Sequence, residues 1–115
     1  MGRTYSSPPA GTQTVIDVLA RFGRALADPI RCRILLALRQ APAYPADLAD
    51  ALGVSRTRLS NHLACLRDCG LVVTVPDGLR TRYELAGPRL GHALAAVVAV
   101  ASDQTCPDAA TKDCC

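Results

Sequence analysis

The sequence predicts a mainly α-helical domain that carries one β-hairpin in its C-terminal half. Half of the 115 residues are apolar but only 3% are aromatic, so the core must be aliphatic, and such a composition favours helices. Apolar residues recur at spacings of three and four along much of the chain, which is the period of an amphipathic helix. Residues 71–85 instead alternate around a Pro-Asp-Gly turn, a pattern typical of a hairpin.

The chain divides into three predicted parts. Residues 1–12 are rich in Ser, Pro and Gly and are expected to form a disordered arm. Residues 13–103 have the length and pattern of one domain, and residues 104–115 form a short polar tail with three cysteines. We expect a cytoplasmic protein with no membrane partner, because no apolar run reaches membrane-spanning length and the N-terminus lacks the apolar core of a secretion signal.

Two helices are predicted at the start of the domain. The first ends near Ala27 and has apolar residues spaced by four, three and four. The second follows directly, with Asp28 as its N-cap and Pro29 at its first position, where a missing N–H does no harm. It runs to about Arg39 and is apolar on most sides, which predicts that it forms the buried centre of the fold. The apolar residues of the first helix are Val15, Leu19, Phe22 and Leu26.

A helix-turn-helix is predicted next. A short helix from Pro45 to Leu52 ends at a tight turn made by Gly53, and Ser55 is the expected N-cap of a longer helix that Gly70 terminates. Two helices joined by a short Gly-containing turn form this motif. The longer helix packs through an apolar stripe made of Leu59, Leu63 and Leu66.

The hairpin and a last helix complete the predicted fold. The hairpin reads as a wing with Arg80, Arg82 and Glu84 on one face, and the last helix is expected to run from Pro88 to about Asp103. The first and last helices are more apolar than a core of this size can absorb, so we predict a homodimer packed through them. The fold class is therefore a homodimeric winged helix-turn-helix.

The outer face of the longer helix carries side chains that can bind phosphates or base edges of double-stranded DNA. The net charge is only +3, but residues 56–84 hold five arginines against three acidic residues, so this side is locally basic. Predicted DNA contacts on the helix are Ser55, Arg56, Thr57, Arg58, Ser60, Asn61 and His62, and on the wing Arg80 and Arg82. For the arginines the alternative is an ordinary solvated side chain. For His62 the alternatives are a hydrogen-bond network beside the recognition surface or an extra metal ligand.

Two thiols lie one turn apart near the end of the same helix. This spacing of Cys65 and Cys69 lets two thiolates share one metal ion. One helix face cannot surround an ion, so a third ligand must come from elsewhere, and Cys106 is the best candidate. Three thiolates suit large, soft cations such as Cd(II), Pb(II) or Hg(II), whereas Mg(II) and Ca(II) would not compete.

The other three cysteines have weaker assignments. Cys32 is alone inside an apolar helix and is expected to be a core residue. Cys114 and Cys115 form a vicinal pair at the C-terminus, which could deliver metal, form an extra site or have no role. In the reducing cytosol all six are expected to be thiols rather than disulfides.

Several segments together resemble the ArsR/SmtB family of winged-helix repressors over roughly residues 13 to 106. The matching segments are Ala-Leu-Ala-Asp-Pro-Ile-Arg-Cys-Arg-Ile-Leu at 25–35, Leu-Ala at 48–49, Gly-Val-Ser at 53–55, Ser-Asn-His-Leu at 60–63 and Leu-Arg-Asp-Cys-Gly-Leu-Val at 66–72. Cys-Leu-Arg-Asp-Cys-Gly at 65–70 and Asp-Gln-Thr-Cys at 103–106 are most similar to the cadmium- and lead-sensing members. The resemblance implies a dimeric repressor that metal releases from its operator, with Cys65, Cys69 and Cys106 as ligands.

Metal sites of other members of that family are missing from the sequence. Residues 43–46 are Ala-Tyr-Pro-Ala, where the arsenic sensors and some cadmium sensors carry a Cys-x-Cys pair. The Asp and His pairs of the zinc sensors are reduced to His92 on the last helix. We therefore expect Cd(II) or Pb(II) as inducer, with Hg(II) or As(III) as alternatives, and no organic cofactor.

The sequence leaves two other function classes open besides metal sensing. A thiol redox sensor would release DNA when Cys65 or Cys69 forms a disulfide with another thiol, and a DNA-binding module without an inducer would make the three aligned cysteines a coincidence. An enzyme is not expected, because the chain has no Gly-rich phosphate loop and only a single Glu.

Overall fold

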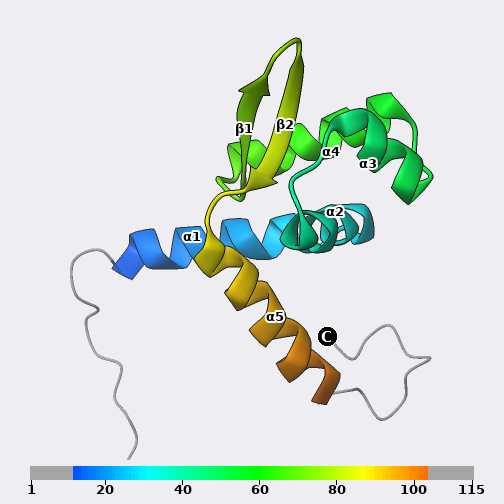
Figure 1. Ribbon diagram of the computed structural model, residues 1–115. Helices are drawn as coiled ribbons and strands as arrows, with labels where there is room; N and C mark the ends of the chain where they lie inside the picture. Colours follow the sequence, from blue (N-terminus) through cyan, green and yellow to red (C-terminus); the bar gives the residue numbers. More distant parts are fainter. Residues whose placement is uncertain (1–11, 104–115) are drawn as a thin grey trace, which may run out of the picture.

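The computed structural model describes residues 12–103, which form five helices and one antiparallel hairpin. The helices are α1 (Thr12–Ala25), α2 (Pro29–Gln40), α3 (Pro45–Leu52), α4 (Arg56–Asp68) and α5 (Pro88–Asp103), and the strands are β1 (Val72–Asp77) and β2 (Arg80–Leu85). In Figure 1, α1 and α2 lie below α3 and α4, the hairpin projects above them as a wing, and α5 leads away from its base. The predicted winged helix-turn-helix is confirmed. The expected arm and the tail with Cys106, Cys114 and Cys115 lie outside the described residues, apart from Thr12.

The corner between α1 and α2 is built from helix-end hydrogen bonds. Asp28 caps α2 as predicted, because its Oδ1 accepts hydrogen bonds from the N–H groups of Ile30 (2.8 Å) and Arg31 (3.2 Å). The helix α1 ends at Ala25, two residues before the predicted end at Ala27. The guanidinium of Arg31 accounts for this difference, since it binds the last carbonyls of α1 and lets the chain turn there.

The helix-turn-helix forms as the sequence predicts. Gly53 ends α3 with a φ of 69°, a left-handed conformation that favours glycine. The Oγ atom of Ser55 then accepts a hydrogen bond from the N–H of Arg58 at 3.1 Å, which caps α4. Gly70, with a φ of 79°, ends α4, and the Leu71 N–H donates back to the Leu66 carbonyl at 3.0 Å.

The core lies where α4 crosses α2 and the base of the wing. The fully buried large side chains are Ile34, Leu35, Leu59, Leu63, Leu66 and Val72. The leucine stripe of α4 thus packs inward as predicted, and its opposite face is left in solvent. No helix among residues 12–103 is long and apolar enough to cross a membrane.

The wing differs from the prediction at its tip. The pairing runs from Val72 opposite Leu85 to Asp77 opposite Arg80, so Pro76 and Asp77 belong to β1 and the turn consists of Gly78 and Leu79. Gly78 takes the positive φ (64°) that a two-residue turn of this kind requires at its first position. The prediction placed the turn at residues 76–78 because Pro usually ends a strand, but Pro is tolerated on an edge strand.

Candidate DNA-binding surface and thiol pair

The first two turns of α4 present a polar face to solvent. Leucines fix the rotation of the helix, because Leu59, Leu63 and Leu66 are buried on one side. The side chains on the exposed side belong to Ser55, Arg56, Thr57, Arg58, Ser60 and Asn61. Six of the seven residues predicted to contact DNA on this helix are therefore accessible on one surface.

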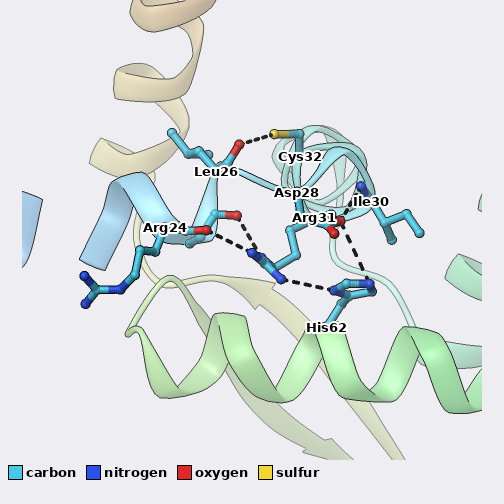
Figure 2. Close-up of polar contacts among 8 residues, drawn as sticks. Arg24, Leu26, Asp28, Ile30, Arg31, Cys32 and His62 are labelled. Atoms are coloured by element: carbon cyan, nitrogen blue, oxygen red, sulfur yellow. Dashed lines mark hydrogen bonds and ion pairs between the residues drawn. The ribbon is translucent and has the colours of Figure 1, made fainter. Parts of the chain in front are cut away.

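His62 is the exception. Its side chain is only 15% exposed and is turned away from the polar face, toward the corner between α1 and α2 (Figure 2). Its Nδ1 atom lies 3.3 Å from Nη1 of Arg31, and its Nε2 atom lies 3.9 Å from Oδ1 of Asp28. The prediction of a direct DNA contact does not match this placement, whereas the alternative of a hydrogen-bond network beside the recognition surface does.

The two wing arginines differ in how freely they could meet a phosphate. Arg80 is 56% exposed, stacks on the ring of Tyr44 at 3.5 Å from its centroid and lies 3.6 Å from Asp47. Arg82 is 32% exposed and pairs with Asp77 at 3.3 Å and Glu84 at 3.0 Å. The hydrogen bond to Glu84 raises the pKa of Arg82 despite its partial desolvation. Arg80 therefore presents the more available positive charge.

Tyr44 organises this side of the molecule, and sequence reasoning did not assign it a role. Its hydroxyl donates a hydrogen bond to Asp77 in the wing, which raises the pKa of the phenol. Next to it, Ala43 and Tyr83 exchange backbone hydrogen bonds of 3.0 and 2.8 Å, so the loop after α2 is joined to β2. An aromatic residue at a helix start, in a chain with so few aromatics, was the one signal available.

A small cavity connects the wing to the start of the recognition helix. It has a volume of about 250 Å³, and it brings together Arg56 of α4 and Arg80 of the wing. Its other lining residues are Tyr44, Pro45, Ala46, Leu79 and Thr81. A larger hollow of about 700 Å³ lies at the wing base beside α5, but neither the exposed residues of α4 nor its thiols line it. One predicted DNA-contacting arginine from α4 and one from the wing therefore line the same small cavity.

The thiols of Cys65 and Cys69 lie together at the C-terminal end of α4. Both are half-buried, and Cys69 continues the helical hydrogen bonding through its N–H to the Cys65 carbonyl at 3.0 Å. Burial raises the pKa of Cys69, and the adjacent Cys65 thiol raises it further. The charges of Arg21 and Arg24 act in the opposite direction, which shows that the pair lies within reach of α1. The structure thus brings together two of the three predicted ligands.

The described part of the chain does not complete a metal site. No group of three or more His, Cys, Asp or Glu side chains that could hold an ion is found within residues 12–103. His62 does not serve as the extra ligand there, since its ring faces Asp28 and Arg31. Cys32 is half-buried, and its Sγ donates to the Leu26 carbonyl at 3.2 Å, as a packed structural thiol would. Two thiols fit a soft cation but require a further donor.

Comparisons with known proteins identify relatives over most of the chain. Residues 28–74 match the bacterial regulatory protein family arsR. The HTH-type transcriptional regulator CmtR of Mycobacterium tuberculosis is 54% identical over 94 residues, which span 78% of this chain and 80% of that protein. These relatives are regulators of transcription and not enzymes.

Solved structures agree with the fold. The NMR structure of the cadmium metal-sensor CMTR from Mycobacterium tuberculosis gives a TM-score of 0.63 at 52% identity and covers 78% of this chain and 97% of that one. A homodimeric winged helix-turn-helix DNA-binding domain from Mycobacterium bovis gives a TM-score of 0.79 at 31% identity, with 86% and 92% covered.

Proposed function

Because the chain belongs to the ArsR family of bacterial transcriptional regulators, we propose that it is a metal-responsive repressor. It binds operator DNA as a homodimer in the cytoplasm and leaves the operator when Cys65 and Cys69 bind a thiophilic ion. One observation carries the proposal: a single helix, α4, holds the exposed polar face at its start and the thiol pair at its end. A change at the thiols therefore acts on the element that meets DNA.

The DNA contacts follow from the exposed residues. We assign Arg56 and Arg58, near the start of α4, to the major groove, where recognition helices meet base edges. Arg80 contacts a phosphate beside it, and Arg82 does so only to the extent that Asp77 and Glu84 leave its charge available. The other exposed polar residues proposed to contact DNA are Ser55, Thr57, Ser60 and Asn61.

Cys106 is proposed as the third ligand, supplied by the partner subunit. The helix α5 has 16 residues, so it extends for about 24 Å, and Figure 1 shows that it leads away from α4. The end of α5, from which the chain continues toward Cys106, is therefore directed away from the helix that carries the thiol pair. A dimer in which the partner's α5 returns toward α4 places that chain within reach.

The donor set favours soft ions. Thiolates prefer Cd(II), Pb(II), Hg(II) or As(III) over hard cations, and a bound ion of this kind supplies strong bonds to sulfur. Similarity to a cadmium sensor favours Cd(II), with Pb(II) next. The two thiols would lose their protons on binding, and α4 holds Cys65 and Cys69 on one face so that both can reach the same ion. An ion also bound by the partner's Cys106 would fasten the end of α4 to the dimer-forming part of the partner.

An ultraviolet titration of the reduced protein with Cd(II) tests the ligand set. We expect a thiolate-to-metal charge-transfer band that weakens in Cys65→Ser, Cys69→Ser and Cys106→Ser, with release of DNA lost in step. Cys32→Ser is the matched control. The Cys32 thiol is hydrogen-bonded to the Leu26 carbonyl, so we expect this variant to leave the band unchanged. A band that survives all three substitutions would contradict the proposed site. Release of DNA by peroxide without metal, and not by Cd(II) under strong reductant, would favour redox sensing.

A further inference from the structure

A polar cluster joins three helices at the corner between α1 and α2. The guanidinium of Arg31, on α2, donates through Nε to the Ala25 carbonyl at 2.9 Å and through Nη2 to the Arg24 carbonyl at 2.9 Å. Its remaining terminal nitrogen, Nη1, points at the imidazole of His62 on α4. Figure 2 shows the guanidinium lying between the end of α1 and the ring.

Two members of the cluster complete helix ends. Arg31 binds two carbonyls in the last turn of α1, where a positive charge is favourable. The Arg24 carbonyl also accepts a hydrogen bond from the N–H of Ala27 at 3.2 Å. Asp28 satisfies two N–H groups at the N-terminus of α2. His62 reaches both of these groups, with Nδ1 3.3 Å from Nη1 of Arg31 and Nε2 3.9 Å from Oδ1 of Asp28. In the tautomer that carries the proton on Nε2, the ring can accept from Arg31 and donate toward Asp28.

We infer that His62 is a positioning residue, which sets the orientation of the recognition helix through Arg31 and Asp28 instead of contacting DNA. The leucine stripe of α4 holds the helix against the core, but apolar contacts are not directional. Hydrogen bonds to a guanidinium are directional, so the contact with Arg31 fixes the rotation of α4 relative to α1 and α2. This inference rests on the DNA binding proposed above.

The cluster also lies next to the thiols. His62 is one turn before Cys65 on α4. Arg31 binds the carbonyl of Arg24, and the side-chain charge of Arg24 lowers the pKa of Cys69. The same corner of α1 is therefore close to the thiol pair and hydrogen-bonded to the helix α4 through Arg31. A shift of α4 at its thiol end changes the geometry that His62 maintains.

Operator affinity of metal-free variants tests the inference. A duplex selected in vitro for tight binding to the wild type serves as probe, and fluorescence anisotropy gives the affinity. His62→Leu and Arg31→Met each weaken binding by about tenfold, as expected for loss of a hydrogen bond to a charged group. His62→Gln restores binding to within about threefold of the wild type, because its amide can both accept from Arg31 and donate toward Asp28.

A double-mutant cycle and a matched control separate positioning from direct contact. The double variant binds no more weakly than the weaker-binding single variant, because each change already removes the contact between Arg31 and His62. Arg33→Met removes the same charge from an exposed neighbouring position on α2 and leaves affinity within about twofold. The inference would be overturned if the losses of operator affinity in Arg31→Met and His62→Leu multiply in the double variant. It would also be overturned if Arg31→Met binds the operator like Arg33→Met.

Folding and metal binding are controlled separately. Where Arg31→Met lacks a cooperative thermal transition, Arg31→Lys replaces it, since a lysine keeps the charge but cannot reach the carbonyls and the ring together. The same weakening is expected for Arg31→Lys, and wild-type affinity would overturn the inference. If the proposed metal sensing is wrong, Cd(II) will not change the DNA binding of the wild type. That result is independent of the affinities measured here without metal.

Discussion

Asp28 shows how a single side chain serves local structure and the recognition helix at once. Partial burial alone would raise its pKa, but hydrogen bonds from the N–H groups of Arg31 and Ile30 and the charges of His62 and Arg31 outweigh this effect. The pKa of Asp28 is therefore lowered, and the folded protein favours the carboxylate. The same carboxylate caps α2 and faces the His62 ring, so its charge matters to both helices.

The lowered pKa of Asp28 predicts a specific dependence of stability on pH. Above its ordinary pKa near 4 the carboxylate stabilises the fold, and this contribution is lost as the pH falls through the lower pKa of the folded state. Asp28→Asn keeps an acceptor for the cap but does not titrate. Urea unfolding should show the wild type more stable than this variant at pH 6, with the difference narrowing as the pH falls below the ordinary pKa near 4. A difference that stays constant over this range would contradict the assignment.

At the scale of elements, the wing is fastened to the helix-turn-helix at its outer edge and at its base. The Tyr44 hydroxyl holds Asp77 near the wing tip, and the backbone bridge between Ala43 and Tyr83 holds β2. Arg80 lies across the Tyr44 ring beside the cavity that Arg56 also lines. The position of the wing arginine relative to α4 is therefore set by an aromatic residue that need not itself touch DNA.

Tyr44→Phe is expected to weaken operator binding by about three- to tenfold, because the wing loses a hydrogen bond to Asp77 while Arg80 keeps its aromatic platform. Tyr44→Ala removes both contacts and should weaken binding further. Tyr83→Phe is the control, since no side-chain hydrogen bond of Tyr83 is found within residues 12–103. Fluorescence anisotropy measures the affinities, and equal binding by Tyr44→Phe and the wild type would show that the wing needs no such anchor.

Elements that depend on local backbone chemistry could be predicted from the sequence, whereas side-chain partners across elements could not. Ser55, Gly53 and Gly70 mark helix ends through hydrogen bonds or positive φ angles within a few residues, so the helix-turn-helix and both ends of α4 were predicted. Whether His62 faces DNA or the corner of α1 and α2 depends on the rotation of α4 in the core. The partners of Arg82 depend on the register of the hairpin, which the prediction placed differently at its tip.

The whole molecule leaves two apolar helix faces uncovered. On α1, Leu19 is 64% exposed together with Val15, Ile16 and Val18, and on α5, Val100 is 60% exposed together with Val97 and Val98. Exposed apolar groups of this extent on neighbouring helices mark an interaction surface. We propose that a homodimer formed through α1 and α5 covers them and sets the distance between the two copies of α4.

Mixed dimers test which subunit supplies the third thiolate. One chain carries Cys65→Ser and Cys69→Ser, the other carries Cys106→Ser, and both lack Cys114 and Cys115. If Cys106 binds across the dimer, the mixed dimer regains one Cd(II) site with its full charge-transfer band, whereas the band of each parent homodimer is weakened or absent. Absence of the band in a mixed dimer that still binds DNA would contradict ligation by the partner.

The central claim is that DNA and metal binding are coupled through α4, and its most direct test is the affinity for Cd(II) with and without operator DNA. Coupling of about 1–3 kcal/mol would weaken DNA binding by roughly 5- to 150-fold on addition of metal, and linkage requires DNA to weaken metal binding by the same factor. A competition titration of the reduced dimer, free and bound to its duplex, measures that factor. We expect equal factors in both directions, and a Cd(II) affinity that operator DNA leaves unchanged would contradict the account.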